Sequence, residues 1–239
     1  MLKSALKYAI RRTGFDVRRY VAPLPENAHL ATMLSANGVN LVFDVGANVG
    51  QFSLSLREAG YKGRIVSFEP LAEAWEKLHE VSREDNLWEI APRGAVGAED
   101  GETEFHVSGN SQCSSVLEMH DAVLKISPKA SYVGIERVPL MRLDTIGVSY
   151  LRPDSVLFIK ADVQGFEDRV LKGARELLRT AVGLYLELSL IPLYEGQQLY
   201  DEIIVELKSS GFVMWDFKPE YFDPLNGRMV WGCGTFFRN

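Results

Sequence analysis

The segment of this chain best suited to chemistry is a short apolar run that contains an acid and leads into a glycine-bearing turn. Residues 41–50 read LVFDVGANVG, with Asp44 near the end of the run and glycines at Gly46 and Gly50. The residues that follow, 51–59, have a helical pattern, and a helix N-terminus offers unpaired N–H groups and a positive dipole end. The glycines let a ligand approach the main chain closely. The charge of Asp44 would repel a phosphate and favour a ligand with a positive centre.

The spacing of this turn separates it from two other ligand-binding loops. The order D-x-G-x-N-x-G puts Asn48 where the dinucleotide fingerprint G-x-G-x-x-G has its middle glycine. A Walker loop requires Gly-Lys-Ser/Thr, and this turn has no lysine. The pattern resembles the first motif of S-adenosylmethionine (SAM) methyltransferases, whose cofactor carries a sulfonium and a carboxylate. The alternative is an ordinary glycine-rich turn between a strand and a helix.

A second acid follows the next expected strand. Residues 64–68 read RIVSF, which is typical of a strand, and Glu69 and Pro70 end it. In a doubly wound sheet, an acid in this place accepts hydrogen bonds from the ribose hydroxyls of an adenosine ligand. Glu69 therefore supports the SAM interpretation, although an isolated glutamate at a strand end is more often simply solvated.

Ionisable residues also crowd the ends of two later strands. Residues 158–167 read FIKADVQGFE, and Glu187 lies within a second apolar run. Neighbouring strand ends would bring Asp162 and Glu187 to one bound substrate, where two close carboxylates raise one pKa and suit a general base for a hydroxyl. Two alternatives stay open. Lys160 could form a structural ion pair with Asp162 or Glu187, or the two carboxylates could hold a magnesium ion.

Alternating strands and helices must position these residues, which predicts a parallel sheet with helices on both faces. Residues 108–129 have little apolar periodicity and are expected to form a lid or a mobile loop. We expect one domain over 39–239, preceded by a helical extension over 1–38. The expected strands are 41–45, 64–68, 88–91, 103–107, 137–143, 156–160, 182–188, 212–217 and 234–237, and the expected helices are 27–37, 50–59, 72–83, 167–178 and 198–210.

Composition narrows the classes of function. The net charge of −6 over 239 residues gives a nucleic-acid partner no electrostatic support. Cys113 and Cys233 fit no metal spacing, and no two histidines form an H-x-x-x-H pair, so no zinc site is expected and no residue is assigned as a metal ligand. Two distant cysteines indicate a reducing compartment, and we expect a cytoplasmic protein. Composition does not predict the oligomeric state.

The first twenty residues are locally basic and carry apolar residues at helical spacing. One interpretation is a helix that lies on an anionic membrane surface, which would make residues 1–20 a peripheral membrane contact. The plainer interpretation is a packed helix with a solvated basic face. No run of 18 apolar residues occurs, so no membrane span is expected.

The ordered set FDVGANVGQ, FEP, GAVG, KADVQGFE, LELS and LYEG resembles the FkbM family of SAM-dependent methyltransferases over about residues 40–237. One departure is Ala161, where the family commonly has Ile or Met; Asp162 beside it is in place. The resemblance implies a Rossmann-like class I methyltransferase fold, with a mostly parallel seven-stranded sheet and a C-terminal antiparallel hairpin. It also implies methylation of hydroxyls, often on sugars, glycans or secondary metabolites.

The resemblance further implies roles for individual positions. Asp162 is the expected base, supported by Lys160 and Glu187, and with Gln164 it would face the acceptor. The glycine turn and the start of its helix would hold the methionine part of SAM, Glu69 the ribose, and the positions after the second and third strands the adenine. The implied cofactor site is Asp44, Gly46, Ala47, Asn48, Gly50, Gln51, Phe52, Glu69, Pro70, Leu71, Gly94, Ala95, Ser114, Ser115, Asp162 and Gln164.

Two other functions remain as alternatives. An NAD-dependent sugar-modifying enzyme would need G-x-G-x-x-G and usually Tyr-x-x-x-Lys, which are absent. A methyltransferase-like domain that binds a partner without catalysis would be expected to lose the glycine turn or Asp162, and both are intact. For the acceptor pocket we expect the 108–130 loop and a set of aromatic residues that could equally be ordinary core: Trp215, Phe217, Tyr221, Phe222 and Trp231.

Overall fold

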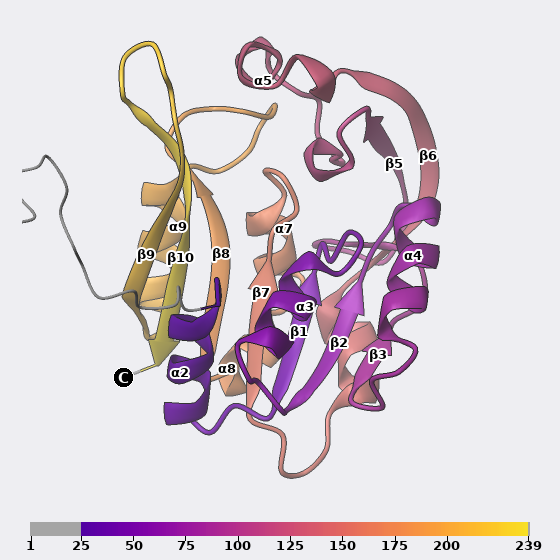
Figure 1. The fold of residues 1–239 in the computed structure, drawn as a ribbon, viewed down its shortest axis with the longest axis vertical. Helices are drawn as coiled ribbons and strands as arrows, with labels where there is room; N and C mark the ends of the chain where they lie inside the picture. Colours follow the sequence, from indigo (N-terminus) through magenta and orange to yellow (C-terminus); the bar gives the residue numbers. More distant parts are fainter. Residues whose placement is uncertain (1–24, 239) are drawn as a thin grey trace, which may run out of the picture.

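The computed structural model describes residues 25–238, which form a seven-stranded sheet between two layers of helices (Figure 1). Five strands are parallel, and the sixth runs antiparallel to both of its neighbours. This confirms the expected mostly parallel sheet with a C-terminal antiparallel hairpin. The order across the sheet is β3 (Trp88–Ile90), β2 (Arg64–Phe68), β1 (Leu41–Val45), β7 (Leu157–Ala161), β8 (Gly183–Ser189), β10 (Met229–Arg238) and β9 (Phe212–Phe222).

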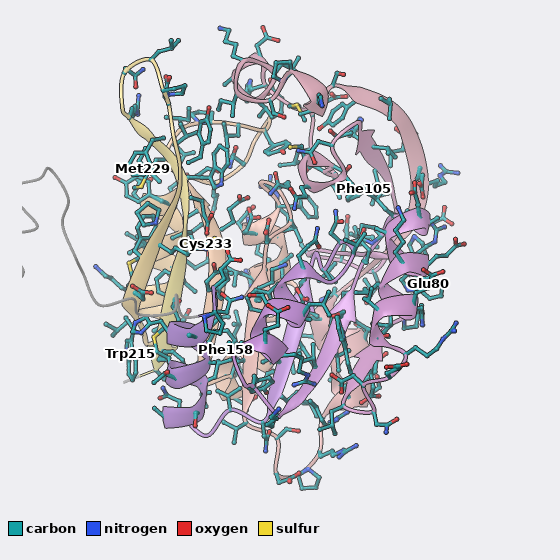
Figure 2. The ribbon with its side chains drawn as sticks, viewed as in Figure 1. Glu80, Phe105, Phe158, Trp215, Met229 and Cys233 are labelled. Atoms are coloured by element: carbon teal, nitrogen blue, oxygen red, sulfur yellow. The ribbon has the colours of Figure 1, made fainter. Side chains whose placement is uncertain are left out.

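Alternate residues of the buried strands point to opposite layers, as strand geometry requires. On β1, Phe43 and Val45 belong to one core cluster and Val42 belongs to another. Phe158 of β7 joins Val42, and Figure 2 shows it within the sheet. The layer on the side of Val42 contains α2 (Ala28–Ala36), α3 (Gln51–Glu58) and α4 (Ala72–Ser82). The opposite layer contains α6 (Leu143–Ile146), α7 (Glu167–Lys172), α8 (Arg175–Thr180) and α9 (Tyr200–Ser209).

Helix α2 lies within the residues that we assigned to an extension. Leu30, Met33 and Leu34 are buried in the same cluster as Val42 of β1, so this helix packs as part of the core of the domain. The boundary near residue 38 stays a prediction. The suggested membrane contact of residues 1–20 lies outside the described residues. No helix within residues 25–238 is both long and apolar enough to cross a membrane.

A second, three-stranded sheet sits beside the main one and was not expected. It has the order β4 (Ala95–Val96), β6 (Tyr132–Met141) and β5 (Gly101–Ser108). The segment between β5 and β6 is not irregular throughout, because it contains the short helices η1 (Ser111–Cys113), α5 (Asp121–Ile126) and η2 (Pro128–Ala130). We refer to residues 109–131 as the lid. A further short helix, η3 (Gly147–Tyr150), follows α6.

Two boundaries differ from the sequence prediction for identifiable reasons. The expected helix 167–178 is split into α7 and α8 at Gly173, where an added Cβ would overlap the backbone of Gly97. Strand β9 continues past Pro219, which is tolerated because β9 is an edge strand whose pairing with β10 is irregular near that point. The hairpin is therefore longer than expected and reaches beyond the rest of the sheet (Figure 1).

Candidate active site

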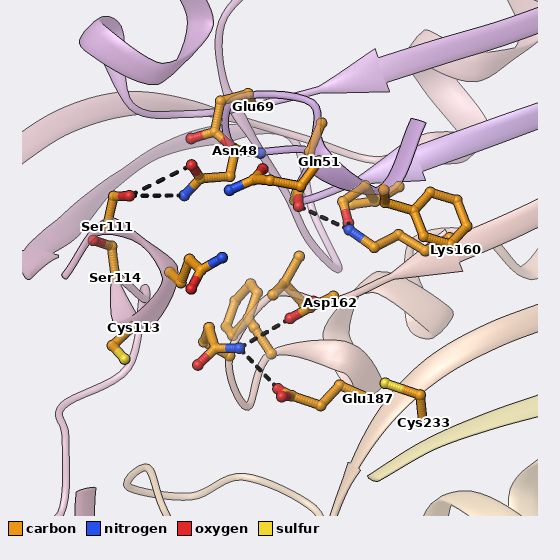
Figure 3. Close-up of a pocket in the computed structure, with 18 of the residues that line it drawn as sticks. Asn48, Gln51, Glu69, Ser111, Cys113, Ser114, Lys160, Asp162, Glu187 and Cys233 are labelled. Atoms are coloured by element: carbon orange, nitrogen blue, oxygen red, sulfur yellow. Dashed lines mark hydrogen bonds between the residues drawn. The ribbon is translucent and has the colours of Figure 1, made fainter. Parts of the chain in front are cut away.

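A cavity of about 580 Å³ opens at the carboxyl ends of β1, β2, β7 and β8 (Figure 3). Open α/β sheets bind ligands at this edge. The turn after β1 and the residues after β2 line one end of the cavity. Asp162 and Gln164 after β7, together with Glu187 of β8, line its centre. The lid and the β9–β10 hairpin supply the remaining walls.

The turn after β1 is built from left-handed backbone. Gly46, Asn48 and Gly50 have φ angles of 74°, 49° and 90°. A Cβ on Gly46 would overlap the carbonyl of Asp162, and a Cβ on Gly50 would lie 2.9 Å from the ring of Trp88. The two glycines therefore bring the turn close to other parts of the protein. Our expectation that both admit a ligand to the main chain needs correction at Gly50, which does not line the cavity.

Asp44 lies beneath this turn and is completely buried. Lys160 is its register partner on the adjacent strand β7, and the lysine Nζ is 3.0 Å from Asp44 Oδ1. Ser53 Oγ donates a hydrogen bond of 2.7 Å to the other carboxylate oxygen. Since Asp44 does not line the cavity, its charge is balanced inside the protein and does not act directly on a ligand. The alternative in which Lys160 forms a structural ion pair with Asp162 or Glu187 is wrong in its partner, because the lysine pairs with Asp44.

Lys160 also holds the turn in place. Its Nζ donates hydrogen bonds to the carbonyl oxygens of Val45 (3.2 Å) and Gly46 (2.8 Å). Burial lowers the pKa of this lysine, but the nearby charges of Asp44 and Asp162 outweigh that effect, so the pKa is raised above its ordinary value. Lys160 is therefore a cation at neutral pH and cannot serve as a base there.

Glu69 lies at the end of β2 with its carboxylate fixed by two backbone N–H groups. Asn48 donates to one oxygen at 2.7 Å, and Leu71 donates to the other at 2.9 Å. Burial raises the pKa of Glu69 to about 7, although both N–H donors act in the opposite direction. The carboxylate lines the cavity and keeps acceptor capacity, since each oxygen has a second lone pair.

A single amide joins the two carboxylates at the centre of the cavity. Gln164 Nε2 donates hydrogen bonds of 2.9 Å to both Asp162 Oδ1 and Glu187 Oε2 (Figure 3). Burial and the neighbouring charges of Asp162 and Glu167 raise the pKa of Glu187 well above its ordinary value. Two close carboxylates were expected to push one pKa upward, and the group that is shifted is Glu187.

Tyr194 holds Gln164 in this position, and the sequence analysis assigned it no role. Its hydroxyl donates a hydrogen bond of 2.9 Å to Gln164 Oε1. Gln164 has the left-handed φ of 56°, and Gly165 follows at 90°. A Cβ on Gly165 would lie 2.9 Å from the ring of Tyr194. The segments KADVQGFE and LYEG therefore meet around one hydrogen-bonded unit, although about 30 residues separate them.

Comparison with known proteins agrees with this geometry. The family model described as a methyltransferase FkbM domain matches residues 44–214, which is most of the chain. The chain belongs to the FkbM methyltransferase family. Its sheet order also matches the expected class I architecture.

Individual relatives of this FkbM chain are distant. It is 24% identical over 203 residues to the 2-O-methyltransferase NoeI of Sinorhizobium fredii, with 81% of each chain covered. It is 39% identical over 88 residues to the AMB antimetabolite synthetase AmbE of Pseudomonas aeruginosa, which covers 34% of this chain but only 4% of AmbE. A solved Klebsiella pneumoniae structure assigned as an O-methyltransferase superposes with a TM-score of 0.50 at 11% identity, covering 99% of this chain and 89% of that one. At this identity the superposition shows a shared fold only.

Most positions implied by the FkbM resemblance lie around the cavity. Asp44, Gly50 and Ser115 do not line it. Ser115 instead donates its hydroxyl to the carbonyl of Gln164 at 2.7 Å, so it supports the site from behind. The lining positions are Gly46, Ala47, Asn48, Gln51, Phe52, Glu69, Pro70, Leu71, Gly94, Ala95, Ser114, Lys160, Asp162, Gln164 and Glu187.

The lid closes over the end of the cavity next to the glycine turn. Asn48 Nδ2 donates a hydrogen bond of 3.1 Å to Ser111 Oγ of η1 (Figure 3). Ser114, just after η1, accepts a hydrogen bond of 2.9 Å from the N–H of Ser108. Four polar lid residues that line the cavity were not singled out by the sequence: Asn110, Ser111, Gln112 and Ser127. Polar side chains in a segment without apolar periodicity predict a loop and do not indicate which of them face a ligand.

The FkbM cavity uses only part of the expected aromatic wall. Tyr221 and Trp231 line it, whereas Trp215 and Phe222 are about half exposed and Phe217 packs against the core. Four lining residues with no clear motif come from the strands, namely Tyr185, Lys218, Glu220 and Cys233, and a fifth, Glu26, lies just before α2. Within residues 25–238 no group of three His, Cys, Asp or Glu side chains could hold a metal ion.

Proposed function

We propose that the chain is a SAM-dependent O-methyltransferase that acts on a hydroxyl of a sugar, a glycan or a secondary metabolite. The observation that carries the proposal is that one cavity joins two groups of residues of different character. Glu69 and the glycine turn form one end, and the cluster of Asp162, Gln164 and Glu187 lies at the centre. A cofactor at the first end would face an acceptor held at the central cluster.

The residues at the first end fit SAM. The Glu69 carboxylate lines the cavity with free lone pairs for ribose hydroxyls. Gly46 and Asn48 would hold the methionine part, with the polar side chain of Gln51 beside them. Apolar side chains there suit an adenine ring: Leu71, Val96, Phe105, Val116 and Phe166. When bound, SAM supplies a methyl group on a positively charged sulfur.

The chain itself must align the acceptor and take its proton. One oxygen of Asp162 accepts from Gln164, and the other is available to a hydroxyl. The raised pKa of Glu187 favours a proton on that carboxyl, so that Asp162 is the member of the pair that receives the acceptor proton. Lys160 keeps the glycine turn in register with β7.

The choice of oxygen as the accepting atom has independent support from one relative. NoeI is a 2-O-methyltransferase by name and matches 81% of this chain, although at 24% identity. The cluster of carboxylates around Asp162 is suited to deprotonating a hydroxyl. No comparable observation favours an NAD-dependent enzyme or a domain without catalysis.

The test combines binding and turnover. Calorimetry should show binding of SAM and S-adenosylhomocysteine and none of NAD. Release of S-adenosylhomocysteine over a panel of hydroxyl acceptors then measures transfer. The Asp162→Asn variant should bind SAM within about threefold of the parent and lose about 10²–10⁴-fold in kcat. The matched control is Asp154→Asn, an exposed residue in the loop before β7. Full turnover by Asp162→Asn would overturn the assignment of the base, and absence of SAM binding would overturn the proposed function.

A further inference from the structure

The β9–β10 hairpin gives the cavity an aromatic wall. Tyr221 of β9 and Trp231 of β10 stack on each other with ring centroids 4.6 Å apart and planes within 9°. Both line the cavity, as do Tyr185 and Cys233 on the neighbouring strands. The stacked rings stiffen one another, and the pair offers a flat apolar surface beside the Asp162–Glu187 cluster.

Within residues 25–238, the lining of this part of the cavity offers no unpaired cation to an anionic ligand. Among the described residues that line it there is no arginine and no histidine, and the lysines are Lys160 and Lys218. The charge of Lys160 is balanced by Asp44. Lys218 Nζ lies between Glu26 (2.9 Å) and Glu220 (2.8 Å), so this group of three carries one net negative charge.

The polar groups that line the same region are mainly hydrogen-bond acceptors. Asp162, Glu187, Glu220 and Glu26 all contribute carboxyl groups. Gln164 contacts only one oxygen of Asp162, and an apolar acceptor molecule that displaced water from the cavity would leave the other oxygen without a donor. A molecule with several hydroxyl groups would supply that donor, and the C–H face of its ring would lie against an aromatic wall.

We propose that the acceptor is an uncharged glycosyl ring that stacks on Tyr221 and Trp231, and that sugars carrying a carboxylate or a phosphate are rejected. The proposal rests on the proposed function, because it assigns the acceptor class of the same site. Rejection follows from placing an anion near Asp162 and Glu220, where the described part of the cavity wall has no unpaired cation to offset it. The acceptor hydroxyl is therefore methylated on a sugar that bears no phosphate or nucleotide near the reacting carbon.

The test measures sugar binding to the full chain saturated with S-adenosylhomocysteine, by ligand-observed NMR titration. The probes are neutral methyl pyranosides (gluco, galacto, manno, fuco and rhamno), with the methyl uronosides and 6-phosphates of the first three. At least one of these three neutral sugars should bind about tenfold or more tightly than its own two anionic forms. If no neutral pyranoside binds, or if the anionic forms bind equally well, the proposal is overturned.

Single substitutions in the aromatic wall test the contribution of stacking separately from that of charge. Trp231→Ala should weaken binding of the neutral sugar about tenfold, and Tyr221→Leu provides a second test if that variant does not fold. Trp215→Ala is the matched control, since this residue lies on the outer side of the same hairpin (Figure 2) and does not line the cavity. Unchanged sugar binding in both Tyr221→Leu and a folded Trp231→Ala would contradict the stacking.

Substitution of Glu26 and Glu220 tests the electrostatic rejection of anionic sugars. The Glu26→Gln/Glu220→Gln double variant leaves Lys218 without its two partners, and it should bind the uronosides about tenfold more tightly than the parent does. An unchanged preference would contradict the electrostatic rejection. Calorimetry with SAM separates two outcomes. Loss of cofactor binding would contradict the proposed function. A failed sugar preference with normal SAM binding would contradict only this acceptor class.

Discussion

Replacing Lys160 with methionine tests the buried ion pair beneath the glycine turn. Lys160→Met keeps most of the side-chain volume but leaves the carboxylate of Asp44 buried with only Ser53 as a hydrogen-bond donor. Removing one partner of such a pair costs about 3–5 kcal/mol. In a chain of this length, that loss lowers Tm by roughly 6–20 °C. Urea unfolding and differential scanning calorimetry of the cofactor-free protein would measure it.

A double variant identifies the cause of that loss. In Asp44→Asn/Lys160→Met the uncompensated charge is gone, so most of the lost free energy of unfolding should return. SAM affinity should fall in both variants, because the hydrogen bonds from Lys160 to the carbonyls of Val45 and Gly46 are lost in each. A loss of less than about 1 kcal/mol in Lys160→Met, or a double variant no more stable than the single one, would refute the reasoning.

Three further predictions concern the residues around the cavity. The folded-state pKa of Glu69, about 7, exceeds its ordinary value of 4.5, so the folded protein holds a proton that the unfolded chain has released between these values. Stability should therefore fall as pH rises from about 4.5 to 7, and Glu69→Gln should remove up to ~1.4 kcal/mol per pH unit of that slope in urea unfolding; an identical slope would contradict it. Tyr194→Phe removes the hydrogen bond to Gln164 and should lower kcat about tenfold at unchanged SAM affinity, with an altered pH–rate profile; an effect on SAM affinity alone would argue for a merely structural role. Gly46→Ala would overlap the backbone at the end of β7 and should abolish SAM binding in calorimetry, whereas Gly38→Ala, also at positive φ but in open space, should cost only about 1–3 kcal/mol of stability.

The central strands were predictable because their runs are buried on both faces and bounded by turns. The expected strands 41–45 and 64–68 match β1 and β2, and 156–160 differs from β7 by one residue at each end. The start of β6 was missed because its first part is an exposed ribbon. Val133 and Ile135 there are 70% and 59% exposed. Their apolar side chains therefore do not mark a face that packs against the core, which is the signal that predicts a strand.

The partners within the site were harder to predict. A continuous apolar run shows no alternation, so the sequence did not indicate that Asp44 and Lys160 face the same side of the sheet. Their pairing depends on the register between β1 and β7. The hydrogen bond from Tyr194 to Gln164 likewise depends on the left-handed backbone at Gln164. The roles implied for individual residues toward SAM stay predictions.

The reversed direction of β10 has a practical consequence for handling the protein. Trp231, near the start of β10, pairs with the last residue of β8, whereas Phe237 pairs with Gly183, the first residue of β8. The strand therefore leaves the sheet at the edge opposite the cavity (Figure 1). An affinity tag or surface tether added after β10 leaves the opening of the cavity unobstructed. One joined directly to Glu26, which lines the cavity, would start at the wall of the cavity and obstruct it.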